Sequence, residues 1–190
     1  MGQDSTGVDT AVFIDSGSVE ETDEWTASNV AGGATRGTIL HKLMEEVLTG
    51  ETADDDAALV TRAGELLTQL GIEPAADRSQ GISPTELAET VLRALALPEV
   101  AVLRPRLVPE YTVFAAEGTN GSERLIFGIA DALALDRDRK IDTVIDWKSD
   151  TRPGTDRLEH YRGQVQAYME STGASRGMLI FMTGGSVLAA

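Results

Sequence analysis

The sequence predicts an α/β (α+β) protein in which helices come first and a mixed sheet follows. Two observations carry this prediction. Apolar residues recur at helical spacing in three segments before residue 98, and strand-like segments dominate from residue 106 onward. One further helical segment interrupts the strands, which is why a mixed sheet flanked by helices is expected rather than separate helical and sheet domains.

Three helices are expected in the first half, because apolar residues there repeat every three or four positions: residues 36–48, 57–70 and 83–97. Gly50 and Gly71 are natural stops for the first two helices. Ser83, Pro84 and Glu86 open the third with a capping-box pattern that has proline at the first helical position. We therefore expect a compact N-terminal helical section.

The second half is expected to hold four strands, one helix and a short fifth strand: strands at 106–116, 124–136, 140–150, 176–185 and 186–190, with the helix at 156–173. Asn120 and Gly121 lie at the centre of the first turn and favour a tight hairpin. The first three strands are thus predicted to form an antiparallel meander.

Composition excludes several classes of function. The chain has no cysteine, which removes disulfides, thiolate zinc sites, cysteine nucleophiles and iron–sulfur clusters together. It has no apolar run of the roughly 20 residues that span a bilayer, and no secretion signal pattern, so we expect a soluble, cytoplasmic protein without membrane contact.

The net charge of −15 argues against strong binding of nucleic acid by the chain alone. The charge is unevenly distributed, however. Residues 1–35 hold seven acids and no base, whereas residues 101–190 hold twelve acids and eleven bases. We interpret residues 1–33 as an acidic arm or loosely packed segment, and the nearly neutral C-terminal half keeps nucleic acid among the candidate ligands.

The most informative segment is the third predicted strand, which ends in Asp146, Trp147 and Lys148. Side chains alternate along a strand, so Asp146 and Lys148 share a face and Trp147 lies opposite. Burying this pair costs several kcal/mol unless the two charges are used or well paired. A structural ion pair at the sheet edge is the alternative reading.

Asp131 strengthens the functional reading, because it sits among apolar neighbours in the preceding strand. Antiparallel pairing could place it beside Asp146, about 4.8 Å away. Two carboxylates at that separation repel each other unless a divalent cation lies between them, and oxygen ligands suit Mg²⁺ or Mn²⁺. Lys148 would then stabilise developing negative charge or act on a bound water.

Asp131 followed by Asp-Trp-Lys at a strand end resembles the motif of the PD-(D/E)XK nuclease superfamily. Further segments are similar to its RecB/AddA-like branch, the C-terminal nuclease domain of bacterial repair helicases: Gly37 and His41 in "RGTILHKLMEE", Gln164 and Tyr168 in "YRGQVQAYMES", Glu110 in "LVPEYTV" and the hairpin "MLIFMTGGSVLAA". The resemblance implies a restriction-endonuclease-like fold over residues 34–190, the nuclease domain, with 50–100 as a helical insert.

The resemblance also implies roles for particular residues. Lys148, Asp146 and Asp131 would be catalytic. The metal ligands would be Asp131, Asp146, His41, Glu110 and the backbone carbonyl of Trp147. Gln164 and Tyr168, one helical turn apart, would brace the site or contact DNA. Each has a simpler alternative: His41 and Gly37 could serve packing, Gln164 and Tyr168 could close the core edge, and Glu110 could be an exposed strand residue.

The function that the resemblance implies is a Mg²⁺- or Mn²⁺-dependent DNA exonuclease acting on single strands or DNA ends in recombinational repair. A Gly-x-x-x-x-Gly-Lys-Ser/Thr segment is absent, so a helicase motor in cis or in trans would deliver the DNA. Two alternatives remain open: a non-catalytic DNA-end or partner-binding module of the same fold, and a structure-specific endonuclease of the superfamily.

Overall fold

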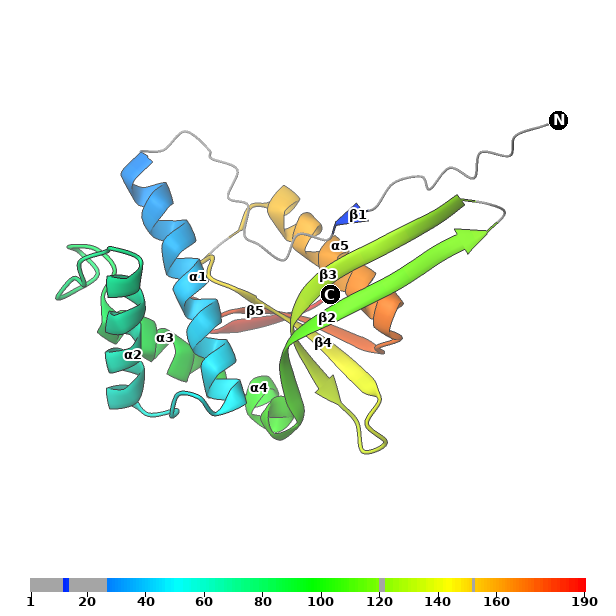
Figure 1. Ribbon diagram of the computed structural model, residues 1–190, viewed down its shortest axis with the longest axis horizontal. Coiled ribbons are helices and arrows are strands. Elements are labelled where there is room, and N and C mark those ends of the chain that lie inside the picture. The colour runs from blue at the N-terminus through cyan, green and yellow to red at the C-terminus, as the bar shows by residue number, and fades with distance from the viewer. Residues whose placement is uncertain (1–11, 14–26, 120–121, 152) are drawn as a thin grey trace.

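A six-stranded mixed sheet with helices on both faces forms the protein (Figure 1). The structure is a computed structural model, and it describes residues 12–13, 27–119, 122–151 and 153–190. Most of the predicted acidic arm and the predicted Asn120–Gly121 turn centre lie outside the described residues. The division of the chain at residue 33 stays a prediction.

The N-terminal helices cover one face of the sheet. They are α1 (Ala27–Thr49), α2 (Asp56–Gln69), α3 (Pro84–Leu95) and α4 (Pro98–Leu103), followed by a 3₁₀ turn at Arg104–Arg106. The three predicted helices are confirmed, but α1 begins earlier than its apolar pattern indicates. Helix α4 was not expected. The third predicted helix does end before Pro98, but this proline also occupies the first position of α4, where its missing N–H costs nothing.

The predicted capping box at the start of α3 was also wrong. Ser83 does occupy the N-cap position, yet its side chain makes no capping hydrogen bond. The carboxylate of Glu86 instead accepts hydrogen bonds from Nη2 and Nε of Arg36 on α1, at 2.6 and 3.0 Å. A charge-assisted bidentate pair of this kind outweighs a neutral capping contact.

The strands follow the predicted order, with one short addition at the N-terminus. They are β1 (Val12–Phe13), β2 (Leu107–Thr119), β3 (Ser122–Leu135), β4 (Ile141–Lys148), β5 (Arg176–Phe181) and β6 (Ser186–Ala189). Strands β2, β3 and β4 form the predicted antiparallel meander, β5 runs parallel to β4, and β6 pairs antiparallel with β5. The mixed sheet flanked by helices is the restriction-endonuclease-like arrangement expected from the sequence.

Helix α5 (Thr155–Thr172) covers the opposite face of the sheet and joins β4 to β5. It ends at Gly173, whose φ of 73° lies in the left-handed region that favours glycine. The alternating side chains of β4 divide between the two layers: Ile145 and Trp147 pack with the N-terminal helices, whereas Val144 packs with α5. The site must therefore form where the two cores meet.

None of the helices in the described ranges combines the length and apolar character needed to span a membrane.

Close packing of α5 on β5 depends on Gly177. A Cβ atom at this position would lie 2.5 Å from Sδ of Met169 and 2.5 Å from Cγ1 of Val165, both on α5. We expect Gly177→Ala to lower the stability by about 1–3 kcal/mol, because a branched valine cannot move aside without disturbing the helix. Thermal unfolding of the purified variant measures this.

Gly163 provides the matched control on the same helix. A Cβ atom there would meet nothing within 4 Å, so Gly163→Ala should raise the melting temperature through helix propensity, worth up to about 1 kcal/mol. Equal melting temperatures for wild type and Gly177→Ala would contradict the described packing of α5 on β5.

Candidate active site

The predicted carboxylates meet at the point where β3 and β4 separate. The antiparallel register pairs Ala132 with Ile145, so Asp131 and Asp146 occupy the next facing positions. Beyond the Ala132–Ile145 pair a side chain takes the place of the backbone carbonyl as acceptor. The backbone N–H of Trp147 donates a 2.7 Å hydrogen bond to Oδ2 of Asp131. Asp131, which is 8% exposed, is thus fixed by the strand that carries Asp146.

The β2–β3 ribbon is bent (Figure 1), and Asp131 lies at an irregular point of β3. On β3, Ala130 and Leu133 both pack on the α5 side, whereas Ala132 packs on the other, so the alternation of faces is interrupted at Asp131. Glu110 faces Asp131 across the ribbon, between the Pro109–Ala132 and Tyr111–Ala130 pairs, and has a left-handed φ of 50°. Such backbone strain is often found at functional sites.

His41 reaches the carboxylates from the middle of α1. Its Nδ1 lies 3.4 Å from Oδ1 of Asp131. Burial lowers the pKa of His41, but the charge of Asp131 and the hydrogen bond to it outweigh burial, and the net pKa is raised. Gly37, one turn earlier, allows this approach: a Cβ atom there would stand 3.0 Å from Oγ of Ser149, just beyond β4.

Lys148 forms the second half of the site with Asp146. Its Nζ lies 2.9 Å from Oδ2 and 3.2 Å from Oδ1 of Asp146, which is 4% exposed. The same ammonium donates to Oε1 of Gln164 on α5 at 3.3 Å. The predicted common face of Asp146 and Lys148 is therefore present, and Trp147 is buried in the opposite core.

Asp131 and Asp146 carry more negative charge than their neighbours offset, so a further positive charge would stabilise their ionised forms. Burial, and then the charge of Asp131, raise the pKa of Asp146 to about 7, although Lys148 and His41 act in the other direction. Burial also raises the pKa of Glu110, helped by the charges of Asp131 and Glu45. Lys148 and His41 therefore do not fully offset the negative charge of Asp131, Asp146 and Glu110.

Gln164 and Tyr168 lie on the face of α5 that packs against the sheet. Gln164 is 8% exposed and touches Lys148, whereas Tyr168 is 1% exposed and donates from its hydroxyl to the carbonyl of Ile129 at 3.0 Å. This bond holds β3 two residues before Asp131. Of the two predicted roles, the geometry fits bracing for Tyr168.

Residues 19–179 match the family model described as the PD-(D/E)XK nuclease superfamily. The chain belongs to this superfamily. The match covers most of the described chain, including all the site residues above. Membership makes the protein a nuclease-type hydrolase domain, and nucleases of the superfamily typically use divalent metal ions.

Two further comparisons add little. A search of curated proteins finds no match. Among solved structures, one similar chain is described as "Crystal structure of SSO0001", with 23% identity over 80% of this chain and 74% of that chain, at a TM-score of 0.37. This similarity is too low to carry an argument about fold or function.

The donor set fits the divalent metal that the PD-(D/E)XK superfamily implies. Carboxylate oxygens and an imidazole suit Mg²⁺ or Mn²⁺, and the buried Oδ2 of Asp146 accepts no hydrogen bond from the described residues although Lys148 is close. Within the described ranges, no three His, Asp or Glu side chains are arranged to hold a metal ion. The carboxylates are instead paired with His41 and Lys148.

Tyr161 and Asp150 complete the surroundings of Lys148. The sequence suggested for Tyr161 only a contact with phosphate, together with its neighbours His160 and Arg162, and it gave no role to Asp150. The ammonium of Lys148 lies 4.1 Å from the centroid of the Tyr161 ring, and the Tyr161 hydroxyl donates to Asp150 at 2.6 Å. The available signal was spacing: Tyr161 lies three residues before Gln164 and hence on the same helix face.

Proposed function

We propose that this PD-(D/E)XK domain is a Mg²⁺- or Mn²⁺-dependent exodeoxyribonuclease of the RecB/AddA-like branch. The observation that carries the proposal is the meeting of Asp131, Asp146 and Lys148 at one strand end, with His41 from α1 and Gln164 from α5 beside them. This is the residue set by which the sequence resembles that branch. A cytoplasmic location, a role in recombinational repair and a helicase partner belong to the same proposal.

The residues that would hold the metal are Asp131, Asp146, His41, Glu110 and the carbonyl of Trp147. When bound, the metal supplies Lewis-acid stabilisation of the phosphate oxygens and favours a hydroxide-like water. The protein's own contribution is positional. The Trp147 N–H fixes the Asp131 carboxylate, and Gln164 keeps the Lys148 ammonium at the strand end. Lys148 orients the attacking water and offsets negative charge as the phosphodiester bond breaks.

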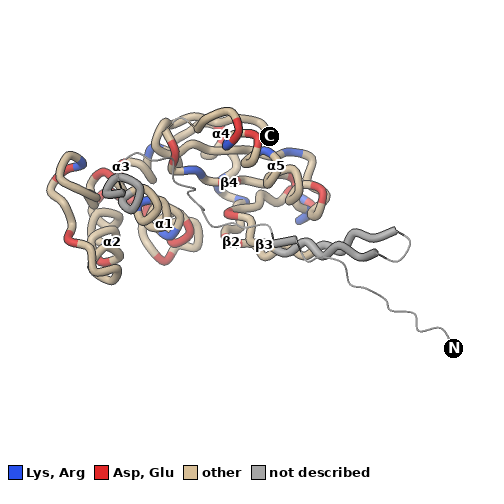
Figure 2. The backbone as a smooth tube through the Cα atoms, turned by 90° about the horizontal axis from the view of Figure 1, so that it is seen from above, with Lys and Arg blue, Asp and Glu red and all other residues tan. Residues whose placement is uncertain are grey.

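The charge distribution supports delivery of the DNA by a partner. Lys and Arg are scattered among Asp and Glu in the described chain (Figure 2), and acids outnumber bases most strongly before residue 101. With a net charge of −15, the domain is expected to bind DNA weakly, because affinity for phosphate depends on Lys and Arg. Tight binding of DNA by the isolated chain, with a steep salt dependence, would argue against a delivering helicase.

Digestion of labelled DNA tests the proposal. Linear and circular single strands of the same sequence are incubated with the protein in Mg²⁺, Mn²⁺ or EDTA. An exonuclease shortens only the linear substrate and only with metal. Cleavage of the circle would identify an endonuclease of the superfamily instead, and no cleavage of either substrate would reject the catalytic assignment.

A non-catalytic module of the same fold is the second candidate. The pairing of Asp131 with His41 and of Asp146 with Lys148 favours it, since these pairs partly neutralise the site without a metal. Such a module would bind DNA ends or a protein partner and leave both substrates intact. The same digestion therefore separates the two candidates.

A further inference from the structure

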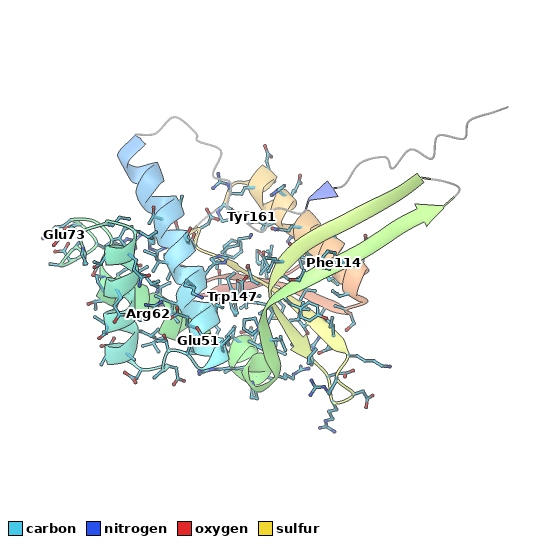
Figure 3. The ribbon with its side chains drawn as sticks, viewed as in Figure 1. Glu51, Arg62, Glu73, Phe114, Trp147 and Tyr161 are labelled. Carbon is cyan, nitrogen blue, oxygen red and sulfur yellow. The ribbon has the colours of Figure 1, made fainter. Side chains whose placement is uncertain are left out.

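The surroundings of Lys148 include a cluster that has no role in the proposed mechanism. It consists of Tyr161 and Arg157 on α5 and Asp150 after β4. Tyr161 is half-buried, and in Figure 3 it lies close to the end of β4 that carries Trp147. Its ring, not its hydroxyl, faces the Lys148 ammonium.

The hydroxyl of Tyr161 is anchored separately. It donates to Oδ2 of Asp150 at 2.6 Å, while Nη1 of Arg157 lies 3.3 Å from Oδ1 of the same carboxylate. Burial and this hydrogen bond raise the pKa of Tyr161 well above its ordinary value, so the hydroxyl keeps its proton. The orientation of the ring is thus set by a contact at its hydroxyl edge, separate from the face that meets the ammonium.

We propose that Tyr161 is a positioning residue for Lys148: its ring face holds the ammonium, and Asp150 holds the ring. The proposal rests on the proposed nuclease function. Among the described residues, the partners of Lys148 are the Asp146 carboxylate, the Gln164 amide oxygen and this ring. A metal bound to Asp146 would compete with the first of them, which leaves Gln164 and Tyr161 to keep the ammonium at the strand end.

A cation over an aromatic face is attracted to the ring quadrupole, most strongly where water is excluded. Lys148 has a side-chain exposure of 12%, so its contact with Tyr161 is largely shielded. Loss of the ring should therefore let the ammonium move. The expected effect falls on kcat rather than on KM for DNA, because Tyr161 acts through Lys148.

Two substitutions separate the ring from the hydroxyl. Tyr161→Leu removes the aromatic face and should lower kcat roughly tenfold with KM unchanged. Tyr161→Phe keeps the face and loses only the hydroxyl bond to Asp150, so its kcat should fall by less than that of Tyr161→Leu. Wild-type kcat in Tyr161→Leu, or an equal loss in both variants, would overturn the proposal.

A spectroscopic measurement tests the placement without any activity. The chain has three lysines, Lys42, Lys140 and Lys148, so ¹³C-labelled lysine gives few side-chain signals, and Lys148→Arg assigns the third. Protons above an aromatic face are shielded, and the Lys148 Cε protons should therefore resonate upfield of the other two sets. The shift should be reduced in Tyr161→Phe, which keeps the ring but loses its anchor, and should vanish in Tyr161→Leu.

Tyr111→Leu is the matched control, since Tyr111 is 40% exposed on β2 and should leave the Lys148 shift unchanged. If Tyr161→Leu does not fold, Asp150→Ala tests the same link by removing the acceptor that anchors the ring, and the Lys148 signals should move towards those of the other lysines. An unshifted Lys148 in the wild type overturns the proposal. A shifted Lys148 in a protein that cleaves no DNA contradicts the nuclease function but supports the placement.

Discussion

Lys148→Ala is expected to lower the rate of DNA hydrolysis by about 10²–10⁴-fold while the protein still binds Mn²⁺. The magnitude is that of a positioned group acting on a reacting water. Metal binding should survive, because the substitution removes a cation that pairs with Asp146 and leaves both carboxylates in place. Digestion of end-labelled linear DNA measures the rate, and isothermal titration with Mn²⁺ measures binding.

Lys140→Ala is the control for Lys148→Ala. Lys140 is exposed in the turn between β3 and β4, so removing it changes the net charge by the same amount at a distance from the site. We expect wild-type hydrolysis from this variant. If Lys148→Ala degrades DNA as fast as wild type does, then Lys148 has no catalytic role.

Asp146→Asn is expected to abolish hydrolysis and Mn²⁺ binding, yet to make the metal-free protein more stable at neutral pH. The pKa of Asp146 is raised from 3.8 to about 7 in the folded protein, first by burial and then by Asp131. A raised carboxyl pKa means that the folded state favours the protonated form. Stability from this group is therefore present below pH 4 and lost as the pH rises towards 7.

The stability difference between Asp146→Asn and wild type should follow that pH dependence. In EDTA at pH 8 we expect the variant to be more stable by about 1–3 kcal/mol, less than the pKa alone suggests because Lys148 loses a partner. Near pH 4 the two proteins should converge. Thermal unfolding across this range measures the difference, with Asp138→Asn, at an exposed turn position, as the control. Lower stability of Asp146→Asn at pH 8 would show that the carboxylate is well paired.

Most helices and strands could be predicted from the sequence, because their apolar spacing reports directly on burial. Helix α4 could not, since Pro98 is compatible with both the end of one helix and the start of the next. Glu86 was assigned to a local cap because the competing partner, Arg36, is distant in the sequence. Local patterns thus failed where a long-range charged contact decided the outcome.

The site could be predicted only in part, for a related reason. The spacing of Asp146 and Lys148 fixes their shared face, and the antiparallel register then brings Asp131 alongside. The alternation of side chains along β3 is interrupted at Asp131, and the backbone of Glu110 has a left-handed φ. Neither feature can be predicted from the two-residue repeat of a regular strand. The contact of Tyr161 with Lys148 depends on how α5 docks on the sheet, which spacing along one helix does not reveal.

We expect Asp131 and Asp146 together to bind a divalent cation beside Lys148. An anomalous difference map from a crystal soaked in Mn²⁺ tests it most directly. We predict a peak in contact with both carboxylates, with Lys148 turned from Asp146 and still close to Gln164 and Tyr161. A map without that peak, in which Asp131 keeps His41 and Asp146 keeps Lys148 as partners, would contradict the account.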